Sequence, residues 1–286
     1  MGHGFTGSVK PCAIILKRIM KIETLIVTMH QNDHSLVERM NVQTDALVGN
    51  QCQTHSMDTF YQNGHKVIYF NTNERGVGRN RNLLLQNATA DVWVLADDDM
   101  RFVDRYPQIA QNAFEECPNA DILVFNLIEK NPRRYVNQKI VRVRWNNYAK
   151  YGAARLVLRK KAFLSSGIRF HLSFGGGARY GSGEDTIFLK ECLRKGLKIY
   201  AVPYALAEID QESVSTWFSG YNEKFFHDKG ALYSCLHPAL WPAYAVRFLI
   251  RYRKKYGGEM PSIQALKYMI GGAVEYRAEV EDHHEV

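Results

Sequence analysis

Gly76-Val-Gly-Arg-Asn-Arg-Asn82 and Asp91-Val-Trp-Val-Leu-Ala-Asp-Asp-Asp99 are the two parts of the stretch that decides the fold of this chain. The first part reads as a glycine turn that opens a basic helix, and the second as a buried strand that ends in three carboxylates. Adjacent carboxylates repel one another unless a cation or hydrogen-bond donors neutralise them. Because α/β sheets place ligands at the carboxyl ends of their strands, we expect a divalent metal ion holding a phosphate here.

The composition describes a globular chain of one large domain, with or without an appendage. Its 286 residues are 46% hydrophobic and 23% charged, and no window reaches the roughly 18 uninterrupted apolar residues of a membrane span. The five cysteines are widely spaced and form no CxxC pair, which favours reduced thiols and a cytoplasmic location. The net charge of +8 is compatible with nucleic acid, anionic lipid or phosphorylated small molecules, without choosing among them.

Strand and helix patterns alternate along the first hundred residues, which indicates an α/β sheet with right-handed crossovers. Buried strands are predicted at residues 23–28, 45–49, 67–70 and 91–96, and helices at residues 36–40 and 76–88.

The second half continues with further helices and strands around a glycine-rich loop. Helices are predicted at residues 106–117 and 186–195, and strands at 121–127, 139–145, 155–159 and 197–202, the last closed by Pro203. The 139–145 segment alternates apolar and basic residues, as an edge strand does, and 155–159 is expected to be its neighbour. The loop from Phe170 to Gly183 is expected to move, and it leads directly into Glu184-Asp185.

The order of these signals matches a known family. Asn50-Gln51 closes the strand predicted at 45–49, and Gly76 is followed by Arg81-Asn82. The acidic triplet then closes the strand predicted at 91–96, and Gly183-Glu184-Asp185 opens a later helix. Over roughly residues 22–205 this order resembles the family 2 glycosyltransferases with the GT-A fold. The resemblance implies an α/β chain with a Rossmann-like, mixed, mainly parallel sheet flanked by helices.

The same resemblance sets the expected domain boundaries. We expect an N-terminal extension over 1–21, a GT-A catalytic domain over 22–205, an aromatic and basic helical appendage over 206–278, and a disordered tail over 279–286. Within the catalytic domain, 22–100 form the nucleotide-sugar half and 101–205 the acceptor half.

A donor site at the acidic triplet is the first functional implication. By position, Asp97 and Asp99 take the family's DxD role, with Asp99 as the direct ligand of Mg²⁺ or Mn²⁺ and Asp97 or Asp98 turned towards the ribose. Hard cations take oxygen ligands, and a metal ion offsets charge on a leaving diphosphate. A solvated strand-end cluster that caps the next helix is the structural alternative.

The remaining nucleotide-sugar contacts are implied by position as well. They are Thr28, Asn50, Gln51, Arg81 and Asn82, with Arg79-Asn80 competing with Arg81-Asn82 for the same role. A solvated helix face explains Arg79 equally well. The commoner family pattern has an acidic residue after strand two, so the identity of the base stays open.

The catalytic base is implied at Asp185, with Glu184 before it. Inverting transfer needs a carboxylate that takes the proton of the acceptor hydroxyl while that oxygen attacks opposite the departing nucleoside diphosphate. An acidic pair at a helix start is also favourable with the helix dipole, which is the structural alternative. Many relatives carry a histidine after the final strand, and here His227 or His237 could replace it only from farther along the chain.

Two interpretations of the C-terminal segment 245–255 stay open. As core, it is a helix packed on the sheet with its arginines exposed. As an interface, Trp241, Phe248 and Ile250 would lie with the neighbouring basic residues on an anionic membrane leaflet.

The sequence therefore predicts a metal-dependent, inverting glycosyltransferase of the hexosyltransferase type. Its donor would be a nucleoside-diphosphate sugar, with UDP favoured, and its acceptor a glycan or lipid-linked saccharide in surface polysaccharide biosynthesis. It would bind no specific nucleic acid, and it would be cytoplasmic or peripheral on the cytoplasmic membrane face.

Two alternatives come from other classes. A sugar nucleotidyltransferase would favour a glycine- and lysine-rich phosphate loop after strand one, where this chain has Met29-His-Gln-Asn32. A non-catalytic carbohydrate-binding, nucleotide-binding or nucleic-acid-binding module on the same fold is the other, and intact Asp97, Asp99 and Asp185 argue against it.

Overall fold

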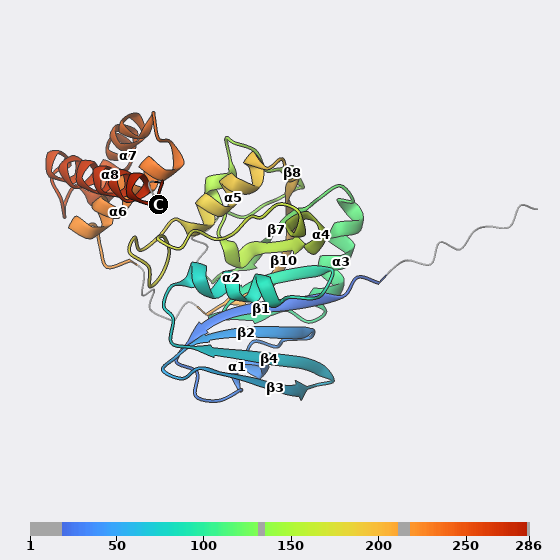
Figure 1. Cartoon of the computed structure of the whole chain (residues 1–286). Coiled ribbons are helices and arrows are strands. Elements are labelled where there is room, and N and C mark those ends of the chain that lie inside the picture. Colours follow the sequence, from blue (N-terminus) through green and yellow to red (C-terminus); the bar gives the residue numbers. More distant parts are fainter. Residues whose placement is uncertain (1–18, 131–134, 211–217, 285–286) are drawn as a thin grey trace, which may run out of the picture.

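The computed structural model describes residues 19–130, 135–210 and 218–284, so most of the expected N-terminal extension lies outside the described residues (Figure 1). In the described part of the chain no helix is long and apolar enough to cross a membrane. The four cysteines within it are free thiols, as the spacing predicts.

Ten strands form one mixed sheet in the described residues, in the order β3-β4-β2-β1-β5-β9-β7-β10-β6, with β8 paired to β10. In chain order they are β1 (Ile22–Met29), β2 (Asp45–Gln51), β3 (Ser56–Gln62), β4 (His65–Thr72), β5 (Val92–Asp97), β6 (Met100–Phe102), β7 (Ile122–Ile128), β8 (Val141–Arg142), β9 (Leu156–Arg159) and β10 (Ile199–Ile209). The run β4-β2-β1-β5 is parallel throughout. This parallel run confirms the α/β class predicted from the alternating pattern.

The helices fall into two groups, one around the sheet and one after it. Those around the sheet are α1 (Leu36–Arg39), α2 (Val77–Asn87), α3 (Tyr106–Glu116), α4 (Lys160–Leu164) and α5 (Glu184–Arg194), with 3-10 turns η1 (Tyr148–Lys150) and η2 (Ala153–Arg155). Those after it are α6 (Glu223–Leu236), α7 (Trp241–Tyr256) and α8 (Ser262–His284).

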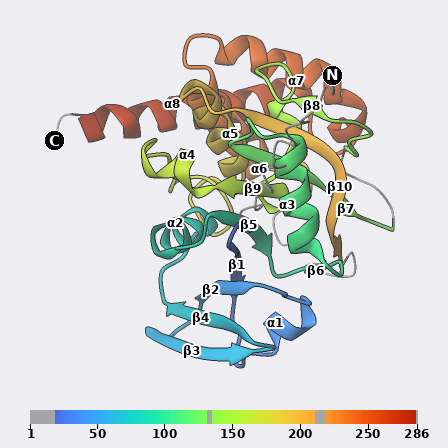
Figure 2. The ribbon, with the colours of Figure 1, turned by 90° about the vertical axis from the view of Figure 1, so that its right-hand side faces the viewer.

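Each face of the sheet has its own apolar core. One core takes Leu36 of α1 and Phe114 of α3, and the other takes Leu84 of α2, Phe163 of α4 and Phe188 of α5. Figure 2 shows α3 on one side of the sheet and α2 and α4 on the other. The strands buried on both faces are the near-continuous apolar runs of the sequence, because both of their faces lose water on folding.

The hairpin β3-β4 adds an edge strand that the strand predictions omitted. β3 alternates exposed and half-buried residues and pairs antiparallel with β4. Asn63 and Gly64 connect the two strands with φ angles of 50° and 81°. Asn-Gly is the usual pair for such a two-residue turn, so the sequence did carry the signal.

The second half of the sheet corrects three expectations. The predicted strand at 139–145 is only two residues long and pairs with β10, and β9 is not its neighbour but lies between β5 and β7. β10 does not stop at Pro203, because the register shifts between Ala201 and Ala205 and leaves the proline outside the ladder. The expected domain boundary at residue 205 therefore falls inside a strand.

The helical region after the sheet forms its own small core. Phe226 of α6, Phe248 of α7 and Met269 of α8 are buried against one another. Phe248 thus belongs to this core, not to an exposed face, and α7 packs mainly on α6 and α8. The tail expected to be disordered from residue 279 differs too: residues 279–284 continue α8.

Candidate active site

The polar ends of β1, β2 and β5 meet at one edge of the sheet. Thr28 lies opposite Asn50 in the β1-β2 ladder, and Val27 lies opposite Asp97 in the β1-β5 ladder. Figure 1 shows the arrowheads of β1 and β4 pointing to the same side. The parallel topology therefore gathers the predicted donor-site residues at the carboxyl edge, as it does in other open α/β sheets.

Arg81 is the cation that joins the two acidic runs. Its guanidinium donates from Nη2 to Asp97 Oδ1 at 2.8 Å and from Nη1 to Glu184 Oε1 at 3.0 Å. Nη1 is also 3.9 Å from Asp185 Oδ1. Phe170 covers the guanidinium, with its ring centre 5.3 Å from Cζ. Helix α2 from the nucleotide half, the end of β5 and the start of α5 are thus held together at one buried side chain.

Burial and charge act in opposite senses on Arg81. Burial by itself lowers the pKa of Arg81, but the carboxylates of Asp97, Glu184 and Asp185 outweigh it and hold that pKa above its ordinary value. Arg81 is 5% exposed, so it is a permanently charged group inside the protein. Such a charge is tolerated because it is paired.

Glu184 is a carboxyl group whose proton is strongly held. Burial raises its pKa to about 8, and the charge of Asp185 and a hydrogen bond with Asp185 act in the same sense, whereas Arg81 lowers it. When two carboxyl groups lie side by side, the charge of the first to ionise raises the pKa of the second. Burial therefore makes Glu184 the carboxyl group of the cluster that holds a proton more readily than an ordinary glutamate.

Asp185 is the more accessible of the pair and has its own anchor. Its Oδ2 accepts a hydrogen bond from the Ala153 N–H at 3.2 Å, and its side chain is 30% exposed. A side chain at Gly152 would place its Cβ 3.0 Å from the same oxygen. The η2 turn therefore fixes the carboxylate while leaving part of it open to solvent.

A second hydrogen-bonded chain links the ends of β1, β2 and β5. Thr28 donates to Asp98 Oδ2 at 2.5 Å, and Gln31 Nε2 donates to Thr28 Oγ1 at 3.0 Å. The amide of Asn50 bonds to the backbone of Gln31 in both directions and donates to Asn71. Asp98 thus turns to Thr28 while Asp97 turns to Arg81, so neighbouring members of the triplet have different partners.

Two of the predicted nucleotide contacts hold the polypeptide itself. Gln51 Oε1 accepts the Gly76 N–H at 2.8 Å, which fixes the turn before α2. Asn82 pairs with both backbone groups of Phe170, at 2.8 and 2.9 Å, and so attaches the start of the glycine-rich loop to α2. Both side chains are buried.

Arg79 lies apart from the acidic cluster. It is exposed and is 3.5 Å from Glu74. It lines a cavity of about 380 Å³ between α2 and the β3-β4 hairpin, together with His55, Phe70 and Asn71. Arg79 and Arg81 are two residues apart on one helix and therefore point in nearly opposite directions. Of the two competing arginines, it is Arg81 that meets the carboxylates.

The donor set of the triplet suits a hard cation shared with a substrate. No three His, Cys, Asp or Glu side chains gather as a metal-binding group among residues 19–130, 135–210 and 218–284. A Mg²⁺ ion that also binds substrate phosphates needs only one or two protein carboxylates. Asp97 and Asp99, both half-buried, offer two. His227 and His237 lie in the helical region, beside Glu275 and against Tyr244 respectively.

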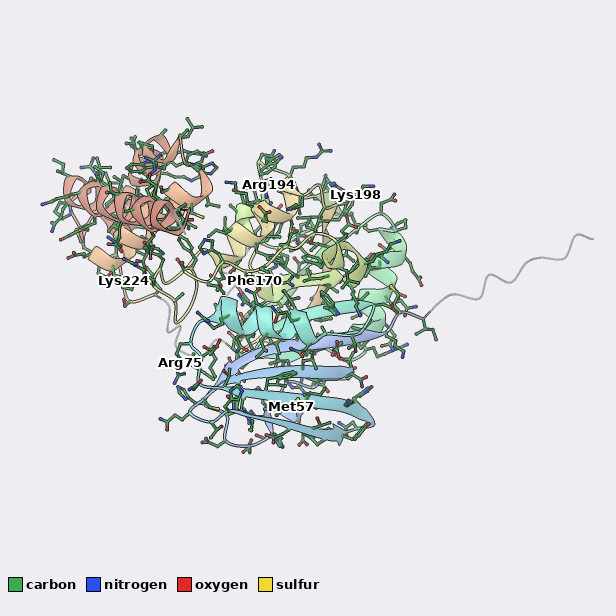
Figure 3. All side chains as sticks on the ribbon, in the orientation of Figure 1. Met57, Arg75, Phe170, Arg194, Lys198 and Lys224 are labelled. Atoms are coloured by element: carbon green, nitrogen blue, oxygen red, sulfur yellow. The ribbon has the colours of Figure 1, made fainter. Side chains whose placement is uncertain are left out.

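Two contributors were missed from the sequence, and a third residue, Arg75, was not singled out there. Phe170 shields Arg81, and Gln31 connects Thr28 with Asn50. Arg75 is exposed at the edge where β4 has ended, and Figure 3 shows Phe170 beside α2 and Arg75 at this edge. The basic character of Arg75 in the turn before α2 is the one signal that could have identified it.

The glycine-rich loop is fastened to α8 and not free. Phe174 and Tyr180 are buried, and both rings pack against Tyr276 of α8. Tyr180 donates to Glu279 Oε2 at 2.9 Å, and Arg179 pairs with Glu275 and Glu279. The expected movement of this loop is therefore opposed by contacts with the C-terminal helix.

Comparisons with known proteins give the family and the fold. Residues 54–172 match the model of glycosyl transferase family 2. A crystal structure of S. aureus TarS 1-349 superposes with a TM-score of 0.58 at 14% identity, covering 93% of this chain and 92% of that one. The same protein in complex with UDP-GlcNAc gives 0.59 at 16%, with the same coverage.

A crystal structure of S. aureus TarS with a longer chain extends the comparison. It gives a TM-score of 0.57 at 15% identity, and the match covers 90% of this chain but 54% of that one. No curated protein sequence matches the chain. Residues 54–172 belong to glycosyl transferase family 2, and the chain is a glycosyltransferase with the GT-A fold.

Proposed function

We propose that this chain is a metal-dependent, inverting glycosyltransferase that takes its sugar from a UDP-sugar. The observation that carries the proposal is the position of Arg81, which ties Asp97 at the end of β5 to Glu184 and Asp185 at the start of α5. A donor-side carboxylate and an acceptor-side carboxylate are thereby placed on either side of one charged group. Transfer between two substrates requires this juxtaposition.

On the donor side, Asp99 with Asp97 would hold Mg²⁺ or Mn²⁺, which offsets charge on the diphosphate leaving group. Thr28 and Asn50 at the ends of β1 and β2, with exposed Arg75 near the same edge, support a nucleotide site there. UDP is the favoured carrier because the structurally similar TarS has been crystallised with UDP and with UDP-GlcNAc.

On the acceptor side, Asp185 would take the proton of the attacking hydroxyl group. It is the accessible member of the acidic pair, and its anchor on Ala153 orients one oxygen while the other faces Arg81. The raised pKa of Glu184 would keep the negative charge beside this base low. The acceptor would be a glycan or a lipid-linked saccharide of a surface polysaccharide.

Thermal unfolding with nucleotides tests the donor half of this proposal. UDP with Mn²⁺ should raise the melting temperature by about 5 °C or more at 100 times its Kd, and GDP and dTDP should raise it less. Asp99→Ala should lose the metal-dependent part of the shift, whereas Asp104→Ala, at an exposed position, should keep it. If no nucleoside diphosphate shifts the melting temperature with either metal, the proposal is wrong.

A further inference from the structure

The outer face of α7 combines exposed aliphatic side chains with basic ones. We define this face as Leu240, Val246 and Ile250 together with Arg247, Arg251 and Lys254, all of which are exposed. The exposed fractions of the three aliphatic side chains are 60%, 45% and 74%. Large aliphatic groups left in water along one helix need a reason, because folding normally removes them.

The pattern along α7 separates buried from exposed residues by helical period. Ala245, Phe248 and Leu249 are buried against α6 and α8, whereas Val246 and Ile250, four residues apart, project from the opposite side. Residues at this spacing lie above one another on a helix. The two aliphatic side chains therefore form a stripe, and a shallow depression runs along it between Pro242 and Arg251.

Charge on α7 has one sign only. The helix carries Arg247, Arg251, Arg253, Lys254 and Lys255, all exposed, and its sequence contains no Asp or Glu. The first acidic residue after it, Glu259, accepts the Tyr221 N–H and so is already engaged. An aliphatic stripe flanked by cations is the pattern of a helix that lies in the interface of an anionic membrane.

The position of α7 in the molecule suits such a contact. Among the described residues α7 packs mainly on α6 and α8. In both Figure 1 and Figure 2, α7 lies at the opposite end of the molecule from β3. A membrane in contact with the outer face of α7 would leave the nucleotide-sugar half facing the aqueous side.

We propose that the outer face of α7 docks on an anionic lipid leaflet, with Val246 and Ile250 inserted among the lipids and Arg247, Arg251 and Lys254 at the headgroups. The exposed aliphatic stripe supplies the apolar contact, and the cations supply attraction to phosphate groups. This docking does not depend on the donor or on the metal, so it can fail while the proposed reaction stands.

Vesicle sedimentation of the full chain tests the proposal. The protein should sediment with vesicles of phosphatidylcholine mixed with phosphatidylglycerol, should stay in solution with phosphatidylcholine alone, and should release as salt is raised. Ile250→Asp should weaken binding about tenfold or more. Its matched control is Leu164→Asp on α4, because Leu164 is 71% exposed and Ile250 is 74% exposed.

A charge variant separates docking from general basicity. Arg251→Glu with Lys254→Glu should weaken binding by about fivefold or more for each cation removed. Lys161→Glu with Lys195→Glu, which changes the net charge equally on other exposed positions, should bind as the wild type does.

Three results would overturn the proposal. One is that the wild type does not sediment with anionic vesicles, and another is that the two charge variants bind these vesicles equally well. The third is that Ile250→Asp binds as well as Leu164→Asp. A change of oligomeric state in Ile250→Asp without any vesicle binding by the wild type would assign the face to a second copy of the chain instead.

Discussion

Arg81 and Glu184 are 103 residues apart in the chain, yet Nη1 of Arg81 lies 3.0 Å from Oε1 of Glu184. The bond joins α2 in the first half of the sheet domain to α5 in the second. The same guanidinium binds Asp97, so any ligand that draws Asp97 away also changes the charge felt by Glu184 and Asp185. The proposed donor and acceptor sides would therefore be linked electrostatically through one buried cation.

Replacing Arg81 should destabilise the protein strongly. Arg81→Ala removes one partner of a buried ion cluster and leaves carboxylates without a counter-charge, which typically costs about 3–5 kcal/mol. The free energy of unfolding in urea measures this cost. Arg79→Ala on the same helix is the matched control, because Arg79 is half-exposed with a partner at 3.5 Å, and it should stay close to wild type. Equal effects of the two changes would remove Arg81 from its central role.

The stability of the wild type should fall as pH rises, through Glu184. Its folded-state pKa of about 8 lies above its ordinary value of 4.5. Between these values the folded state holds a proton that the unfolded state lacks, so this group's contribution is complete below pH 4.5 and is lost as pH approaches about 8.

Glu184→Gln should remove that part of the pH dependence. As pH rises, the free energy of unfolding of Glu184→Gln should increase relative to that of the wild type. The slope of this difference should be at most about 1.4 kcal/mol per pH unit for one proton. Denaturation series across this pH window measure the slope, and Glu38→Gln at an exposed position of α1 serves as the control. Parallel pH profiles for wild type and Glu184→Gln would contradict the raised pKa.

Removing the base should separate binding from chemistry. Asp185→Asn keeps the size of the side chain and an oxygen for the Ala153 N–H, so nucleotide binding should persist. Transfer should fall by at least about 100-fold, because an amide cannot take a proton from the acceptor. Turnover with an added nucleotide sugar and binding by thermal shift are measured on the same preparation. Wild-type turnover in Asp185→Asn would exclude this residue from the mechanism.

Gly49 should tolerate no side chain. A Cβ there would lie 1.8 Å from Oδ1 of Asn80, whose Nδ2 donates to the Gly49 carbonyl at 2.7 Å. Gly49→Ala should therefore cost about 1–3 kcal/mol of unfolding free energy. The control is Gly258→Ala, where an added Cβ meets nothing within 4 Å. Adding Asn80→Ala to Gly49→Ala should restore part of the loss, and no restoration would show that the clash lies elsewhere.

Shortening α8 should loosen the loop before the base. Truncation after Val274 removes Tyr276 and Glu279, which hold Tyr180 and Arg179. Proteolysis between residues 173 and 183 should become faster, because the loop loses its apolar and polar anchors. Truncation after Glu281 keeps both anchors and should digest as the full chain does. Equal digestion rates in the two truncated chains would show that α8 does not hold the loop.

Local patterns in the sequence were sufficient for much of the sheet. The apolar runs before Thr28, Asn50 and Asp97 became β1, β2 and β5, because parallel strands buried on both faces need continuous apolar residues. Their carboxyl ends then had to share one edge, so the chain itself determined that Thr28, Asn50 and Asp97 would be neighbours. The hairpin signal Asn63-Gly64 was equally local, although it was overlooked.

The tertiary structure alone decided which groups meet across that edge. In the sequence Arg81 matched the family pattern and Arg79 competed with it. Only the packing of α2 against Phe170 and α5 showed that Arg81, not Arg79, meets the carboxylates. The same packing raised the pKa of Glu184 and fixed Asp185 on Ala153. Periodicity reports the burial of a residue within its own element, whereas ion pairs between segments a hundred residues apart exist only after those elements have packed.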